Sequence, residues 1–248
     1  MRPLGWDELR ERKLAARVPQ MKHEPKFIQR VGYSNIYGVD SCIIWQSGFD
    51  IDADGSPHAY APPRSGLVGL DYLVNAKNER GEFVGVAVDE RGQPFIQGKN
   101  DPAPGFYVST TSLQDNSLDK SDQRRYVNSE TIPFAVIPNL HWFTVRKAAL
   151  GTLGVAYYRH TKMHEFFVVA DVGPMHKIGE GSIRLAHSLG INADAKTGGV
   201  SGGVVFMLFS GTSHDFAFPT RLVDDSTKFF QRWGDMPELI KLVEELFS

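Results

Sequence analysis

Short apolar runs without intervening helices are the feature that most limits the fold of this chain. Six runs rich in β-branched and aromatic residues follow one another, each bounded by Gly, Pro, Asn or Asp. Such runs are typical of strands. Because helices do not alternate with them, a doubly wound parallel sheet is not expected. We predict a mainly β protein with a few helices, built as a small barrel or sandwich. The runs are Cys42–Trp45, Phe83–Val88, Phe134–Ile137, Gly154–Tyr158, Phe166–Ala170 and Val204–Phe209.

The two ends of the chain differ from this middle part. Residues 1–25 are predicted to form a peripheral arm, with a short polar helix over 6–17 before Pro19 and Pro25 interrupt the chain. Residues 26–233 are expected to form the β-domain. Residues 234–248 are predicted to form a C-terminal helix docked on that domain, because apolar residues recur there at helical spacing.

One internal helix is predicted, from Ser182 to Leu189. Ser182 is a suitable N-cap, and Gly190 suits the left-handed position that follows a helix. No other helix is expected between the arm and residue 234.

Composition excludes several classes of protein. The chain has 248 residues and a net charge of −2, so bulk charge does not favour nucleic-acid binding. Its single cysteine, Cys42, excludes an internal disulfide framework and a cysteine-based zinc cluster. No apolar stretch has the length of a membrane span or of a secretory leader, so we expect no membrane partner and leave the localisation open. A monomer is expected.

An acidic turn, Asp50-Ile-Asp52-Ala-Asp54-Gly55, resembles the opening of a calcium-binding loop. An EF-hand needs a glutamate at the twelfth loop position, where this chain has Ala61. A lone calcium site, an acidic turn between strands and an acidic wall for a cationic ligand remain as interpretations. We predict no metal site and no cofactor.

Two carboxylates nine residues apart are the strongest catalytic candidates. Asp171 ends an apolar run, and Glu180 lies between two glycines just before the predicted helix. A glycosidase needs such a pair, one as proton donor and the other as base or nucleophile. The structural alternative is that Asp171 begins a turn and Glu180 favours the helix N-terminus through the dipole. Neither a Gly-x-Ser-x-Gly elbow nor a P-loop is present.

Several segments together resemble the chitosanases of glycoside hydrolase family 75. The likeness runs from about residue 40 to about residue 220, and the stretch Asp171–Ile183 is its most specific part. Two departures are the missing leader peptide and Ala53, where fungal members have cysteine. The segments are Asp50–Tyr60, Gly69–Leu73, Asn100–Thr111, Tyr126–Val127, Ile132–Pro133, Ala170–Pro174, Lys177–Ile183 and Leu189–Ile191.

The resemblance implies an endo-acting enzyme that cleaves β-1,4 links between glucosamine units of chitosan with inversion. It implies a six-stranded double-psi β-barrel, with Asp171 and Glu180 as the essential carboxylates. Because chitosan is a polycation, we expect an acidic cleft. The expected substrate-binding residues are Asp50, Asp52, Asp54, Tyr60, Asp71, Tyr107 and Lys177.

The roles within the pair stay open at this point. Burial after an apolar strand would raise the pKa of Asp171 and favour it as the acid, and Lys177 near Glu180 would favour an ionised base. Against this, glutamate has the higher reference pKa. Two alternative functions are a related barrel enzyme acting on peptidoglycan or partly acetylated chitin, and a non-catalytic polysaccharide-binding module.

Overall fold

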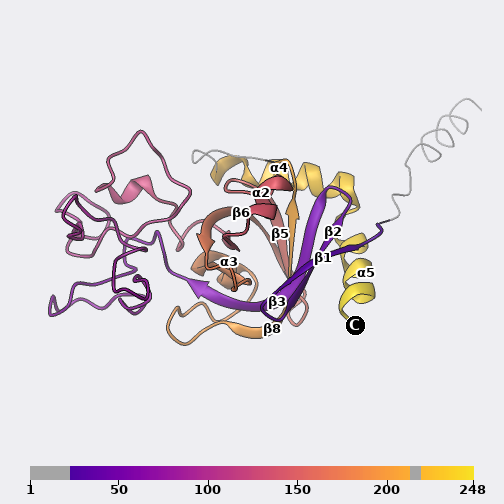
Figure 1. The fold of residues 1–248 in the computed structure, drawn as a ribbon, viewed down its shortest axis with the longest axis horizontal. Coiled ribbons are helices and arrows are strands. Elements are labelled where there is room, and N and C mark those ends of the chain that lie inside the picture. Colours follow the sequence, from indigo (N-terminus) through magenta and orange to yellow (C-terminus); the bar gives the residue numbers. More distant parts are fainter. Residues whose placement is uncertain (1–22, 213–218) are drawn as a thin grey trace, which may run out of the picture.

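The computed structural model describes residues 23–212 and 219–248 (Figure 1). Strands dominate, and short helices lie between and after them. In the described part no helix is long and apolar enough to cross a membrane. The elements are β1 (Lys26–Val31), β2 (Ser34–Val39), β3 (Cys42–Asp52), η1 (Gln123–Arg125), β4 (Phe134–Pro138), α2 (His141–Val145), β5 (Leu153–Tyr158), β6 (Met163–Gly173), β7 (Glu180–Ser182), α3 (Ile183–Ser188), β8 (Val200–Phe209), α4 (Pro219–Trp233) and α5 (Asp235–Phe247).

Six strands close into a barrel. Their order around the ring is β3-β7-β4-β6-β5-β8, and the β3–β8 pairing completes the circle. The β3–β7 and β4–β6 contacts are parallel, and the other four are antiparallel. The hairpin of β1 and β2 continues outward from β3. The six-stranded barrel expected from the resemblance is therefore confirmed.

The barrel wall is apolar on both faces. In β8, Val205, Met207 and Phe209 belong to one buried cluster, which also contains residues of α4 and α5. The alternate residues of β8 belong to a second cluster, together with residues of α2 and α3. Because both faces are covered, the strands appear in the sequence as continuous apolar runs rather than alternating ones.

Two helix predictions are confirmed and one is wrong. Ser182 caps α3 by accepting a hydrogen bond from the Leu185 amide at 3.1 Å, and α5 occupies the predicted C-terminal segment. The statement that Ser182–Leu189 is the only internal helix is wrong, because α2 and α4 are also present. In α4 the buried stripe includes the polar Ser226, which weakens the apolar periodicity, and α2 is too short to show one.

One strand prediction is also wrong. Phe83–Val88 forms only isolated bridges. In contrast β7, which lies just before the predicted helix and was not predicted as a strand, belongs to the barrel. The three residues of β7, Glu-Gly-Ser, have little intrinsic strand preference, so their pairing with β3 and β4 decides their conformation. The hairpin of β1 and β2 was not predicted either. Most of the predicted N-terminal arm lies outside the described residues.

A long excursion, residues 53–133, connects β3 to β4 and forms the loops at the left of Figure 1. Two buried glutamines satisfy backbone groups inside it. The Gln123 side chain accepts from the Ser109 amide and donates to the Gly55 carbonyl, at 2.8 and 2.9 Å. Gln97 similarly bonds Pro57 and Ala103. In this segment, hydrogen bonds from the two glutamine side chains satisfy backbone groups that a strand ladder would otherwise satisfy.

We predict that Gly181→Ala destabilises the barrel. A Cβ at position 181 would lie 2.8 Å from Phe49 Cζ and 2.9 Å from the Phe134 carbonyl oxygen. Crowding of this kind costs about 1–3 kcal/mol. Thermal unfolding should show a lower melting temperature than the parent. Gly202→Ala is the matched control, because a Cβ there meets nothing within 4 Å. Equal melting temperatures for the two variants would contradict the prediction.

Candidate active site

The strand register brings the two candidate carboxylates to one face of the barrel wall. Glu180 of β7 and Asp171 of β6 both pair with Val136 of the intervening strand β4. On the other side of β7, Glu180 pairs with Asp50 of β3. Paired residues point to the same face, and adjacent strands are about 4.8 Å apart. The backbones of Asp171 and Glu180 are therefore separated by two strand spacings, roughly 9–10 Å.

A β-bulge in β6 gives Asp171 this orientation. Ala135 pairs with Val169, but Val136 pairs with Asp171, so Ala170 is the extra residue. Without the bulge, Asp171 would lie opposite Ile137 and point to the other face. The Leu113 amide of the excursion donates to the Ala170 carbonyl at 2.8 Å, which ties the bulge to the loops above it.

All the hydrogen bonds to the Asp171 carboxyl group go to one of its two oxygens. Its Oδ1 accepts from the Ser112 amide at 3.2 Å, the Ser112 hydroxyl at 2.5 Å and the Val172 amide at 2.7 Å. Among the described residues, Oδ2 has no hydrogen-bond partner. Burial raises the pKa of Asp171 to about 6, the Ser112 and Val172 hydrogen bonds oppose the increase, and the negative charge of Glu180 adds to it. Asp171 is thus able to hold a proton near neutral pH.

Glu180 has a cationic partner. Lys177 Nζ lies 3.0 Å from Glu180 Oε1 and 3.3 Å from Asp50 Oδ2. Burial disfavours the Lys177 charge, but the two carboxylates outweigh it and raise the pKa of Lys177. The other oxygen, Oε2, would lie 3.7 Å from a Cβ at Gly173, two residues beyond Asp171 on β6. Glu180 therefore has one oxygen on Lys177 and one on the side toward β6.

The acidic turn supplies two more carboxylates to the same region. Burial raises the pKa of Asp52, and the charges of Asp54, Glu180 and Asp171 raise it further. Burial and the charge of Asp171 likewise raise the pKa of Asp54, against a 2.6 Å hydrogen bond from the Tyr60 hydroxyl. The turn is therefore one wall of the candidate site, and Asp71 contributes a weaker field from behind Asp54.

The predicted binding residues divide into three groups. Asp50 is 65% exposed and can contact a ligand directly. Asp71 is buried and accepts from the side chain of Asn75 at 2.9 Å. Tyr60 and Tyr107 are 2% and 8% exposed, so their rings pack in the core of the excursion and do not present a face to a sugar. Among the described residues, no three histidine, cysteine or acidic side chains are arranged to hold a metal ion.

Sequence reasoning missed Ser112 and Gly173. Ser112 lies 59 residues before Asp171, and a serine in a polar loop gives no local signal of its partner. Gly173 follows Asp171 in the Asp-Val-Gly-Pro motif, and its missing side chain leaves space beside Glu180. The sequence does not indicate this space, because it depends on both β6 and β7 pairing with β4.

Comparison with known proteins adds no relative. No family model matches this chain, and no curated protein matches it. The assignment of a function therefore rests on the residues and geometry described above.

We predict that Asp52→Asn stabilises the protein at neutral pH. Asp52 has a higher pKa in the folded than in the unfolded chain, so folding stability falls as pH rises through these two pKa values. Asparagine removes the charge but keeps an acceptor for the Asp54 amide. We therefore expect a higher free energy of unfolding than that of the parent at neutral pH.

Thermal unfolding of both proteins between pH 4 and pH 8 measures this gain, which should shrink toward acid pH. The matched control is Asp115→Asn. Hydrogen bonds from Ser117 lower the pKa of Asp115, so the folded protein favours the charged form of this side chain. A loss of stability in Asp52→Asn at neutral pH would contradict the prediction.

Proposed function

We propose that the protein is an inverting endo-glycosidase that cleaves β-1,4 links between glucosamine units of chitosan. The observation that supports this most is the common pairing of Asp171 and Glu180 with Val136. It puts the two side chains on one face, on backbones about two strand spacings apart. Inverting glycosidases need roughly 6.5–9.5 Å between the carboxyl groups, whereas retaining enzymes need about 5 Å.

Asp171 is the general acid in this proposal. Its pKa of about 6 leaves about half of the groups protonated at pH 6 and about a tenth at pH 7. Oδ2 is the oxygen available to hold that proton. Asp171 donates the proton to the glycosidic oxygen as the bond between that oxygen and C1 breaks. The resulting carboxylate is stabilised by the hydrogen bonds from Ser112 and Val172.

Glu180 is the general base. The Lys177 ammonium lies 3.0 Å from its Oε1, and Oε2 takes a proton from a water molecule on the opposite face of the sugar. The oxygen of that water attacks C1 and inverts its configuration. Hydrolysis by this route needs only two carboxyls, a water molecule and positioning of the sugar.

The acidic wall supports a cationic substrate. Asp50, Asp52 and Asp54 lie on or beside the strand that pairs with β7. A cationic unit bound there would favour the ionised forms of Asp52 and Asp54, whose pKa values are raised in its absence. The net charge of −2 does not oppose this, since steering depends on local charge. An aminosugar polymer is favoured over a neutral or acidic polysaccharide.

The first test is cleavage of highly deacetylated chitosan, followed as new reducing ends. We expect the parent to cleave it and Asp171→Asn and Glu180→Gln each to lose at least about 100-fold in rate. Asp115→Asn, which changes a carboxylate held by Ser117 in the excursion, should keep parental activity. NMR of the first products should show the α-anomer.

The proposal fails if the folded parent does not cleave chitosan, or if both variants keep their activity. A β-anomeric first product would contradict inversion but not the identity of the pair. Cleavage of peptidoglycan or acetylated chitin in place of chitosan would favour the related barrel enzyme.

A second prediction concerns pH. Activity should fall as pH rises above about 6, because Asp171 then loses the proton it donates. Ser112→Ala removes a hydrogen bond that favours the Asp171 carboxylate, so the pKa of Asp171 should rise. The alkaline limb of the kcat/KM profile should move upward by about one unit.

Ser117→Ala is the control for this shift. Ser117 is an exposed serine of the same excursion that hydrogen-bonds Asp115. Its profile should match that of the parent. An unchanged alkaline limb in Ser112→Ala would show that Asp171 is not the group titrating there.

A further inference from the structure

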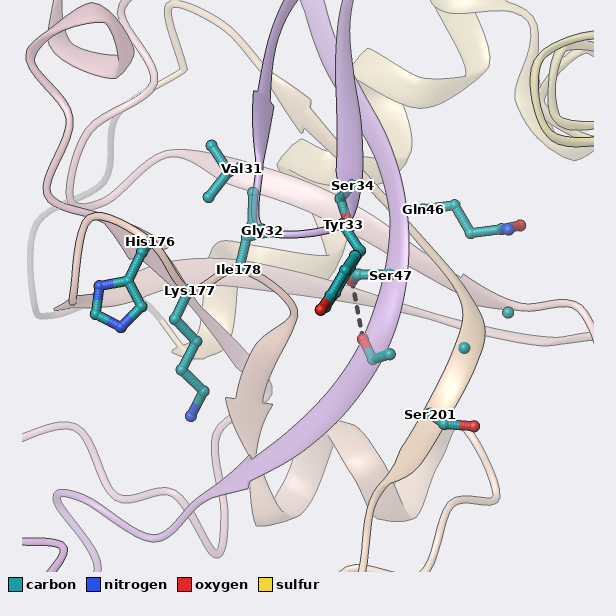
Figure 2. Close-up of a pocket in the computed structure, with 13 residues that line it drawn as sticks. Val31, Gly32, Tyr33, Ser34, Gln46, Ser47, His176, Lys177, Ile178 and Ser201 are labelled. Carbon is teal, nitrogen blue, oxygen red and sulfur yellow. Dashed lines mark hydrogen bonds between the residues drawn. The ribbon is translucent and has the colours of Figure 1, made fainter.

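A separate pocket of about 440 Å³ has Lys177 in its lining but neither of the carboxylates that are paired with this lysine. It is formed by the turn between β1 and β2, the middle of β3, the loop between β6 and β7 and the first residues of β8 (Figure 2). None of the residues named so far as acid, base or acidic wall lines it. Its polar and aromatic lining includes Tyr33, Gln46, Ser47, His176, Lys177 and Ser201.

This pocket adjoins the Glu180 side of the candidate active site. Lys177 lines it and also lies 3.0 Å from Glu180 Oε1. Ser47 and Gly48 line it from β3, two to three residues before Asp50. A Cβ at Gly179 would lie 2.6 Å from the Gly48 carbonyl oxygen, so β3 and the residue before Glu180 are in close contact. A sugar chain bound over Glu180 can therefore continue into the pocket.

The lining of the pocket differs from the acidic wall because it contains no carboxylate. Its one lysine, Lys177, is already paired with Glu180 and Asp50, so its charge is compensated there. The ammonium group of a glucosamine unit would therefore find no counter-ion in the lining. An N-acetylated unit is neutral, and its amide and hydroxyl groups match the hydroxyl of Ser47 and the other short polar groups of the lining.

Tyr33 provides an apolar surface at the mouth of this pocket. Its side chain is 96% exposed at the tip of the β1–β2 turn. In Figure 2 the ring stands beside Ser47, with Lys177 and His176 across the opening. An exposed aromatic ring next to convergent polar groups is the usual composition of a small-molecule site, and a ring face of this kind can stack on the C–H face of a sugar.

We propose that this pocket is a sugar subsite that takes an uncharged, N-acetylated aminosugar unit, with Tyr33 as its stacking surface. The inference rests on the proposed glycosidase function, since it places the pocket along the same sugar chain. The acidic wall then binds glucosamine units, and the pocket binds an acetylated unit at one fixed position relative to the cleaved bond. The preferred substrate is partly acetylated chitosan.

Binding without cleavage tests the subsite. Asp171→Asn serves as the background, because Asp171 does not line the pocket. The probes are the trimer of N-acetylglucosamine and the trimer of glucosamine, titrated by NMR or calorimetry. We expect Tyr33→Ala in this background to weaken binding of the acetylated trimer roughly tenfold. Binding of the glucosamine trimer should not change.

Phe27→Ala is the matched control. Phe27 is another exposed aromatic residue of the same hairpin, and it does not line the pocket. It should leave both affinities unchanged, and Tyr33→Phe should restore binding of the acetylated trimer. The proposal is overturned if the acetylated trimer does not bind, if Tyr33→Ala leaves its affinity unchanged, or if both trimers lose affinity equally.

The subsite and the proposed function can fail separately. If the parent cleaves chitosan but the acetylated trimer does not bind, the subsite is wrong and the glycosidase stands. If the acetylated trimer binds in a Tyr33-dependent manner but no chitosan is cleaved, the glucosamine-cleaving function is wrong. The products of partly acetylated chitosan give an independent readout, since Tyr33→Ala should raise KM for this polymer and abolish the fixed position of the acetylated unit.

Discussion

The pairing of β7 with two neighbours is the constraint on which the rest of the structure depends. Three residues close the barrel between β3 and β4, and one of them is Glu180. The Asp50 amide donates to the Gly179 carbonyl at 2.9 Å, which fixes the register where β7 begins. A slip by one residue would turn Glu180 to the opposite face of the wall. Barrel closure and the placement of Glu180 therefore depend on the same pairing.

The same arrangement concentrates negative charge, and the structure compensates for it only in part. Lys177 is shared between Glu180 and Asp50, while Ser112 and Tyr60 donate hydrogen bonds to Asp171 and Asp54. These three donor side chains are fewer than the four carboxylates they contact. The pKa values of Asp52, Asp54 and Asp171 remain raised. A cluster of this kind lowers stability, so its presence is better explained by function than by folding.

The sequence allowed some of these features to be predicted. The apolar runs predicted five barrel strands, because each is buried on both faces, and the Ser182 cap with Gly190 predicted α3. The β7 strand could not be predicted, since Glu-Gly-Ser has no strand pattern of its own. Neither could the bulge at Ala170, which places Asp171 on the face of Glu180, because it depends on the register between β4 and β6 and on the Leu113 contact. The nine-residue spacing in the sequence made Asp171 and Glu180 candidates. The pairing of their strands with β4 is what brings them together.

Lys177 connects two different environments along one surface. Its ammonium group is paired with Glu180 and Asp50, and its side chain also lines a pocket without a carboxylate. A uniformly cationic polymer would find counter-ions at the carboxylates and none in the pocket. A polymer with both charged and neutral units can satisfy both, provided that its neutral unit falls at the pocket. Under the proposed function, this arrangement turns a general attraction for aminosugars into a preference for a particular order of units along the chain.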